Sequence, residues 1–598
     1  MKQFNRVLSV LGLGLILTTA GFSSVGGNES APKREKRAQQ KVEIKVTPWG
    51  RSQAEIDAAN ARIERSAAVQ KELNGTRYRL LESSYIENET KGQPAQVPTQ
   101  LRAVFYDYTN DRTIVAESGF DNASPVTVRQ EFYQPNPNDE EYAEAVRILQ
   151  GDGRFTGILR GDKVRAFRPM PPVTVLSGTT ERLVNIGLDG LGDTANNEVV
   201  SVSIKRAEVI RYENRAPDTS LANAGSCGIP SANQGSTARG TAGQYQLSVM
   251  QDRAIIWEML VIRPAASSGT MASGIEIRDV KYKGKSVMKR GHAPVLNVQY
   301  VPRPGEGSCG PYRDWQYSEG FFNAPAAGAT YPNGNSGGIA VLADGQIAMT
   351  SLETGVDSGN FRGVAIYKQN DEVVMISEMD AGWYRYIMEW RFANDGTIRP
   401  RYGFGATNNG CVCYRHNHHV YWRFDFDIVN PVNKVFQVEK GRKFLQPVTT
   451  EMTRFKNIQT NRSLLIQNST GDEAYLLVPN KTDGDAIFKY PETGATSDYG
   501  RSDLWVLRYK SVVGGSNLQN EIDDGWNSIG GNCTATSGSC INITPFINNE
   551  SVSNQDVVVW YGAHFVHADG QNILNPDRSP SILSGSHVVG PDIRPVRW

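Results

Sequence analysis

From residue 244 to its end at residue 598, the sequence alternates short strand-like runs with turns and shows very little helical periodicity. Runs rich in β-branched and aromatic residues that end in Gly, Pro, Asn or Asp are typical of β-strands joined by turns. A segment of this length without helices can bury its strands only against other strands. We therefore expect residues 244–598 to form one large, mainly antiparallel β-sandwich rather than several small domains.

Two smaller units are expected ahead of the sandwich, each with a helix followed by strands. Helical apolar spacing occurs at residues 52–71 and again at 139–150, where Asn138 is the expected N-cap and acidic residues fill the first turn. We predict a small α+β (cystatin-like) domain over 45–133, a second small α+β domain over 134–215, and a linker rich in Pro, Gly, Ser and Asn over 216–243. The strand-like runs lie at 76–86, 99–108, 112–120, 155–161, 163–170, 182–190 and 198–213.

The N-terminus has the composition of an export signal. Lys2 and Arg6 precede an apolar run from residue 7 to residue 17, and small residues ending in Ala20 follow it. The run is shorter than the roughly 20 residues that a membrane span needs. We predict a signal peptide over 1–20, a disordered leader over 21–44, and an exported protein, periplasmic or secreted, that does not insert into the membrane.

Charge and cysteine content narrow the class of protein further. The 63 basic residues balance the 63 acidic ones and form no basic stripe, so a nucleic-acid partner is not expected. The 6 cysteines fit an oxidising compartment. Cys533 and Cys540 bracket a polar loop and are expected to form a local disulfide, and Cys227 and Cys309 are candidates for a pairing over a longer distance.

A cluster of histidines is the first candidate site. Three of the seven histidines, His416, His418 and His419, fall within four residues. On a strand, residues i and i+2 point to one face, so His416 and His418 can present two imidazoles side by side, an arrangement suited to two ligands of one transition metal. The nearby Cys411 and Cys413 are either soft metal ligands or buried or disulfide-bound thiols.

Two further sequence elements accompany the histidine pair. Upstream, an aromatic strand and a turn contain, in order, Gly382, Tyr384, Tyr386, Trp390, Phe392, Asp395, Gly396, Ile398 and Pro400. In the histidine element itself, four residues separate His418 from Arg423, which is followed by Phe424 and Asp425. Near the C-terminus, Asp556, Val558 and Trp560 form an Asp-x-Val-x-Trp strand, and His567 follows seven residues after the tryptophan.

In order and internal spacing, these three elements resemble those of the copper- and topaquinone-dependent amine oxidases. That family has small α+β domains ahead of a large β-sandwich that dimerises and carries the active site. The resemblance implies that His416, His418 and His567 bind Cu²⁺ and that Tyr384 is the precursor of topaquinone. It also implies a homodimer that oxidises primary amines with dioxygen to aldehyde, ammonia and hydrogen peroxide.

The resemblance also assigns the groups around the quinone. Tyr300 matches the tyrosine that contacts the quinone ring. Counting forward from Tyr300 by the family interval places the catalytic base at Asp314, whereas anchoring on the following Trp-Gln and Gly places it at Ser318, beside Glu319. We prefer Asp314, because a carboxylate can remove a proton and a serine cannot do so without help.

A peripheral divalent-cation site found in some members of the family has a matching set here. It would use the carboxylates of Asp425, Asp427 and Asp556 and the carbonyls of Phe426 and Val557. Hard oxygen donors of this kind suit Ca²⁺ or Mn²⁺. The alternative is that the acids cap strands or pair with Arg423.

The sequence departs from the family pattern beside the quinone tyrosine, where Trp383 replaces an asparagine, Arg385 an acid and Asp380 a threonine. Three hypotheses follow. The first is an active exported amine oxidase, and the second is a catalytically inactive copper-binding β-sandwich derived from one. The third is a redox enzyme whose crosslinked cofactor uses Trp383, Tyr384 or the nearby cysteines.

Overall fold

The structure, a computed structural model, describes residues 42–86, 91–131, 135, 137–159, 164–167, 181–189, 198–211, 228–229, 243–267, 274–300, 312–313, 326–332, 338–407, 412, 416–481, 483, 502–509, 547–567 and 589–598. The expected signal peptide, the leader up to residue 41 and all but two residues of the expected linker up to residue 242 lie outside this set. Within it, no helix has both the length and the apolar character to cross a membrane.

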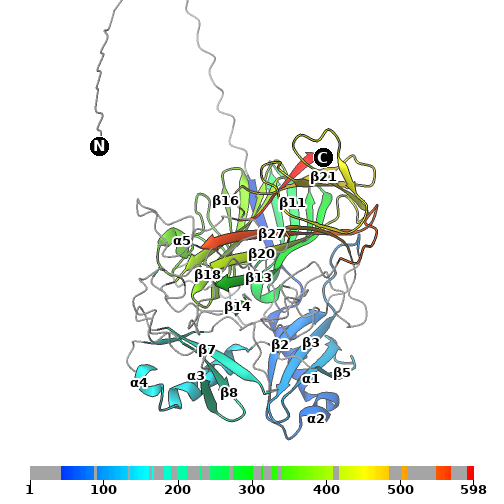
Figure 1. The fold of residues 1–598 in the computed structure, drawn as a ribbon. Coiled ribbons are helices and arrows are strands. Elements are labelled where there is room, and N and C mark those ends of the chain that lie inside the picture. The colour runs from blue at the N-terminus through cyan, green and yellow to red at the C-terminus, as the bar shows by residue number, and fades with distance from the viewer. Residues whose placement is uncertain are drawn as a thin grey trace, which may run out of the picture. The chain divides into compact units, whose positions relative to one another are not determined.

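Two large sheets dominate the described part of the chain (Figure 1). The first runs in the order β1 (Val42–Trp49), β10 (Gln244–Gln251), β11 (Ala254–Ile262), β12 (Glu276–Tyr282), β13 (Lys285–Tyr300), β20 (His416–Phe426), β27 (Val557–His567), β26 (Leu504–Arg508) and β23 (Met452–Arg454), with β14 (Tyr312–Arg313) beside β13. The second runs in the order β15 (Ile339–Val341), β16 (Val364–Gln369), β17 (Glu372–Ala381), β18 (Tyr384–Ala393), β19 (Ile398–Ala406), β28 (Asp592–Arg597), β25 (Ala474–Val478), β24 (Ser463–Asn468), β21 (Asn433–Val438) and β22 (Gln446–Val448).

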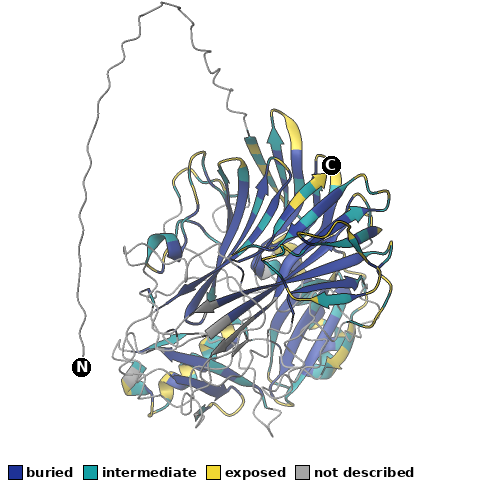
Figure 2. Ribbon diagram, turned by 45° about the horizontal axis from the view of Figure 1, so that its top comes forward, coloured by how far each residue is buried: buried dark blue, intermediate teal, exposed yellow. Residues whose placement is uncertain are grey.

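Aromatic side chains from the two sheets pack against each other and form the main core. The rings of Trp390 on β18 and Trp422 on β20 lie 5.3 Å apart, and those of Trp257 on β11 and Phe392 on β18 lie 5.0 Å apart. The Trp257 indole N–H donates to the carbonyl of Ala393 at 2.9 Å, so burial leaves that donor satisfied. The central strands are buried along their length (Figure 2). The predicted β-sandwich, mainly antiparallel, is therefore confirmed.

Both smaller units pair helices with a four-stranded sheet among the described residues. The first contains α1 (Gln53–Arg65), α2 (Ala67–Leu73), β2 (Tyr78–Ile86), β3 (Gln100–Asp107), β4 (Arg112–Gly119) and β5 (Thr127–Glu131). The second contains α3 (Asp139–Gly151), α4 (Thr156–Leu159), β6 (Arg165–Phe167), β7 (Leu183–Asp189), β8 (Glu198–Ser203) and β9 (Glu208–Arg211). A 3₁₀ turn, η4 (Pro264–Ala266), and the short helix α5 (Ser351–Thr354) lie in the sandwich region.

The apolar spacing read from the sequence marks the buried faces of the helices. Ile56 and Ile63 of α1 are buried in one cluster with Phe105 and Ile114 of the sheet. Burying a side chain of this size stabilises the fold by about 1.5–3 kcal/mol. The expected single helix over 52–71 is instead two helices, because the hydroxyl of Ser66 caps the second by accepting from the Val69 N–H.

Two other expectations from the sequence differ from the structure. The run at 155–161 was expected to be a strand, but Thr156–Leu159 is a helical turn, begun by the N–H groups of Phe155 and Thr156 donating to the Asp152 carbonyl. A short apolar run does not distinguish the two states. In addition, β1 pairs with β10 of the sandwich from Val42↔Gln251 to Trp49↔Gln244. The expected boundary at residue 45 thus falls inside a sandwich strand.

Candidate functional site

Tyr384 is the first residue of β18, directly after a two-residue turn. Ala381 of β17 pairs with Tyr384, and Gly382 and Trp383 make the turn between them. Gly382 has a φ of 66°, a conformation that glycine adopts without the cost that a Cβ imposes. The Tyr384 side chain has no exposed surface. The phenol therefore points into the protein, and the tight turn fixes where its strand begins.

Arg385 anchors this turn from inside the protein. Its Nε and Nη2 atoms donate to the two carboxylate oxygens of Asp357 at 2.8 and 2.6 Å, and Nη1 donates to Asp380 at 2.8 Å. Nη1 also donates to the carbonyls of Gly382 at 3.2 Å and Tyr384 at 3.1 Å. Burial by itself lowers the pKa of Arg385, but the two carboxylates outweigh it and raise that pKa. Arg385, one of the three residues that depart from the family pattern, thus holds the backbone carbonyls on both sides of Trp383.

Trp383 itself packs toward the second small unit. Its side chain is buried, and its ring lies 5.8 Å from the ring of Phe167 on β6 at an interplanar angle of 72°. Its carbonyl accepts hydrogen bonds from the N–H of Thr407 at 2.8 Å and from the Thr407 hydroxyl at 3.0 Å. The indole is therefore a fixed part of the core beside Tyr384.

Two neighbouring strands, β20 and β27, bring the predicted copper ligands to one end of the first sheet, and β13 beside them brings Tyr300 there (Figure 1). His416 at the start of β20 is paired directly with His567 at the end of β27, and on its other side with Tyr300 at the end of β13. The side chains of these three residues lie outside the described set. The backbone register alone makes two histidines that are 151 residues apart in sequence (567 − 416) adjacent in the sheet.

His418 is the fully described member of the predicted ligand set. It is buried, and its ring lies 4.6 Å from the ring of Tyr384 and 4.5 Å from that of Phe404, on which it stacks. Its Nδ1 atom is 3.1 Å from the hydroxyl oxygen of Tyr386. Tyr384 and Tyr386 share one face of β18, with ring centroids 5.6 Å apart. Tyr384, the predicted quinone precursor, and His418, a predicted metal ligand, are therefore in direct contact.

The contact with Tyr386 suits a metal-bound histidine. A ligating imidazole donates the N–H of its other nitrogen to an acceptor, which fixes both the tautomer and the ring plane. With a metal on Nε2, the Nδ1–H of His418 would donate to the Tyr386 oxygen at the observed distance. Imidazole nitrogens are suitable ligands for Cu(II). The predicted donors are therefore of a type that suits copper, and Tyr386, which the sequence placed only in a motif, would orient the ring of His418.

We expect Tyr386→Phe to weaken copper binding by about 10–100-fold, because it deletes the oxygen that accepts from the imidazole of His418. Competition with a chelator of known affinity measures this change. The matched control is Tyr475→Phe, which removes a buried hydroxyl that donates to the Gly396 carbonyl at 3.1 Å. An equal loss of copper affinity in both variants would contradict the assigned role.

A second histidine pair lies on the opposite face of the same two strands. His419 and His564 are paired in the β20–β27 register, and their Nδ1 atoms are 2.7 Å apart. The Nε2 atom of His564 is 2.8 Å from the carboxylate of Asp503. Burial lowers the pKa of both histidines, so both are neutral at pH 7. His564 then donates from Nε2 to Asp503 and accepts at Nδ1 from His419, a buried structural chain.

The predicted peripheral cation set is also brought together. The ligand oxygens of Asp425, Asp427 and Asp556 lie within 4.8 Å of one another, and Phe426 pairs with Val557 in the ladder beside them. Burial, together with the charge of Asp425, raises the pKa of Asp427 and that of Asp556. The Lys91 ammonium, which no sequence pattern singled out, forms ion pairs with all three carboxylates.

Several predicted residues lie outside the described set. They are Asp314, Ser318 and Glu319, the alternatives for the catalytic base, and all six cysteines. His292 is buried, with Nδ1 3.9 Å from the Glu276 carboxylate, and is placed with the core rather than with the copper set. The base and the disulfides remain predictions.

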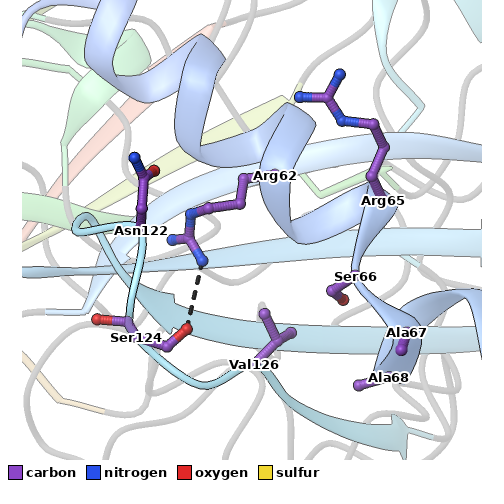
Figure 3. A pocket seen from close by; sticks show the side chains of 8 residues that line it. All are labelled: Arg62, Arg65, Ser66, Ala67, Ala68, Asn122, Ser124 and Val126. Carbon is purple, nitrogen blue, oxygen red and sulfur yellow. Dashed lines mark hydrogen bonds between the residues drawn. The ribbon is translucent and has the colours of Figure 1, made fainter.

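A surface pocket occurs in the first small unit, between the α1–α2 junction and the segment from Asn122 to Val126 (Figure 3). Its volume is about 490 Å³, and it contains none of the predicted site residues. Arg62, which lines it, donates to the carbonyls of Gly119 and Ser124 and to the Ser118 hydroxyl. These bonds tie the arginine to the β4–β5 connection, a structural role.

The sequence matches no protein-family model and no curated protein. The fold does match solved structures. A copper-containing benzylamine oxidase from Hansenula polymorpha is 13% identical over 92% of this chain and 97% of its own, with a TM-score of 0.57. An Aspergillus nidulans amine oxidase (13%, 92% and 88%, TM-score 0.54) and a Pichia pastoris lysyl oxidase (13%, 87% and 85%, TM-score 0.50) are also similar. The chain thus has the fold of the copper-containing amine oxidases.

Proposed function

We propose that this protein is an exported copper- and topaquinone-dependent oxidase of primary amines, with Tyr384 as the quinone precursor. One observation carries the proposal: the ring of Tyr384 lies 4.6 Å from the ring of His418, at the end of the sheet where His416 pairs with His567. Three sequence elements that are distant along the chain meet there. The fold of the solved copper-containing amine oxidases supports the same reaction class.

His416, His418 and His567 would hold the copper ion. Copper held there would supply the redox chemistry with dioxygen by which the Tyr384 phenol would become a quinone that can accept electrons from an amine. Tyr386 would accept a hydrogen bond from the Nδ1–H of His418, which would leave the Nε2 lone pair available to the metal. Phe404 packs on His418 and Tyr386 lies beside Tyr384, and the burial of all four side chains would limit the access of water to Tyr384.

The remaining roles belong to the chain's own acid–base and positioning groups. Asp314 is the proposed base that removes a proton from the carbon next to the amine nitrogen, and Tyr300 is the proposed contact to the quinone ring. Arg385 holds the carbonyls of Gly382 and Tyr384, which limits movement of the strand that carries the cofactor precursor. We also propose that the protein is a homodimer.

A catalytically inactive copper-binding protein is the second candidate. It is favoured by Trp383, a bulky residue that occupies the asparagine position of the family and packs on Phe167. The two candidates differ in what happens to Tyr384 when copper and oxygen are present. An inactive protein would bind copper through the same histidines and leave the phenol unmodified.

The experiment is an assay of hydrogen peroxide and aldehyde release by copper-loaded, aerated protein on a panel of aromatic and aliphatic primary amines. We expect turnover of at least one amine, and we expect phenylhydrazine, which reacts with quinone carbonyls, to abolish it. Copper-free protein is the matched control. Copper-loaded protein that has no visible chromophore and releases no peroxide from any amine would favour the inactive candidate.

A further inference from the structure

Three carboxylates meet where β20 ends and β27 begins, and an ammonium group from a distant loop lies among them. Lys91 Nζ is 3.3 Å from an oxygen of Asp427 and 3.1 Å from an oxygen of Asp556, and it also donates to Asp425. An ammonium has three N–H donors and no acceptor, which matches three carboxylates. The Lys91 side chain is only 15% exposed.

The remaining side of the ammonium is covered by an aromatic ring. Lys91 Nζ lies 4.0 Å from the centroid of the Tyr509 ring, within the range of a cation–π interaction. The Tyr509 N–H donates to the backbone carbonyl of Asp556 at 2.9 Å. This bond holds Tyr509 next to Asp556, directly before the start of β27. The ammonium is thus held by three carboxyl groups and one aromatic face, as a bound cation would be.

The loop that carries Lys91 is fastened to the sandwich at independent points. The N–H of Ala95 donates to the carboxylate of Asp279 on β12 at 2.6 Å. Lys289 on β13 donates to the carbonyl of Gln93 at 2.8 Å and to Asp279 at 2.6 Å. These bonds fix part of the β2–β3 connection to the sandwich, and they therefore hold Lys91 beside the three carboxylates.

A divalent ion and this ammonium would exclude each other. Ca²⁺ needs oxygen ligands at roughly 2.3–2.6 Å, and the carboxylates that would supply them all contact Lys91 Nζ. An ion placed beside the ammonium would also meet like charge at short range. We propose that Lys91 is the resident cation of the Asp425–Asp427–Asp556 cluster, tethered in the place of a divalent ion, and that the cluster binds Ca²⁺ or Mn²⁺ only when the lysine charge is removed.

The consequence is a contact that joins the first small unit to the sandwich without a metal. The cluster keeps one positive charge at any calcium concentration, because its cation is covalently part of the chain. The ion pairs bridge more than 300 residues of sequence, the separation of Lys91 from Asp425 being 334. The contacts of Lys91 do not involve the predicted copper site, so they would be the same in a catalytically inactive protein.

Calcium titration of the full-length protein tests the proposal, using calorimetry and thermal unfolding with CaCl₂ alone. Calcium does not compete for imidazole ligands, so copper content can be left unchanged. We expect wild type to show no calcium site tighter than roughly 1 mM, the weak end for protein calcium sites, and no change in its melting temperature. Lys91→Met, which keeps the aliphatic stem, should bind one Ca²⁺ per chain at least tenfold more tightly and melt at a higher temperature when calcium is added.

The matched control is Lys285→Met, which removes a lysine that pairs with the single carboxylate of Glu473 and is 46% exposed. It should behave as wild type. Adding Asp427→Asn to Lys91→Met should abolish the new calcium site and so locate it. Lys91→Gln replaces Lys91→Met if the latter does not fold. One calcium bound per wild-type chain as tightly as in the variant, or a folded variant that binds none, would overturn the proposal.

Discussion

Copper-loaded, aerated Tyr384→Phe protein should contain copper but no quinone chromophore, and its amine oxidation should fall below about 10⁻⁴ of the wild-type rate. A loss of that size corresponds to more than about 5 kcal/mol of transition-state stabilisation. The physical reason is that phenylalanine lacks the oxygen at which ring oxidation begins, whereas His418 and its other contacts are untouched. The ring itself still fills the space beside Tyr386 and His418.

Visible absorbance, phenylhydrazine reactivity and copper content, measured on one preparation, check this prediction. The control is Tyr282→Phe, which deletes another buried hydroxyl, one that donates to the Asn394 carbonyl at 2.9 Å. That variant should retain both chromophore and activity. A Tyr384→Phe protein that still reacts with phenylhydrazine would place the cofactor on another residue and would support a different crosslinked cofactor.

Arg385→Met is expected to have the largest effect on stability, a loss of about 3–5 kcal/mol. Removing one partner of a buried ion pair leaves the other charge without compensation in a place that water does not reach. Here the abandoned group is the buried carboxylate of Asp357, which accepts two hydrogen bonds from the guanidinium. The carbonyls of Gly382 and Tyr384 lose a donor at the same time. The turn before Tyr384 should loosen, and quinone formation should slow.

Denaturant unfolding followed by tryptophan fluorescence measures the loss. Arg594→Met is the matched control, because its ion pair with Asp592 is at the surface and Arg594 is 53% exposed, where such pairs contribute about 0–1 kcal/mol. Adding Asp357→Asn to Arg385→Met should recover part of the stability by removing the uncompensated charge. Equal stability of Arg385→Met and Arg594→Met would contradict the stabilising role assigned to the buried ion pair of Arg385 and Asp357.

The sandwich and part of the candidate site could be predicted from the sequence, because both depend on local patterns: strand-like runs and the spacing of residues within one strand. Runs rich in β-branched and aromatic residues along 416–426 and 557–567 mark strands, and the described side chains of both strands are buried. Residues two apart on a strand share a face, so the spacing alone puts His418 with His416 and Tyr384 with Tyr386. The contact between Tyr384 on β18 and His418 on β20 depends on how the two sheets pack, which the spacing of residues does not specify.

Contacts made by side chains from distant parts of the chain could not be predicted. No sequence pattern around Lys91 indicates that its ammonium contacts Asp425, which is 334 residues away, because a single lysine in a polar loop belongs to no recognisable motif. The same holds for Arg385 and Asp357, a buried pair whose members are 28 residues apart in sequence. β1 was assigned to the wrong unit for a related reason: an edge strand carries no mark of the sheet that it joins.

The most direct test of the central claim is the mass of the tryptic peptide that contains Tyr384, taken from copper-loaded, aerated wild-type protein. A topaquinone at this position predicts a peptide that has gained two oxygen atoms and lost two hydrogen atoms, with fragment ions that place the change on Tyr384. An unmodified Tyr384 in protein that holds one copper per chain would contradict the proposed function and leave an inactive copper-binding sandwich.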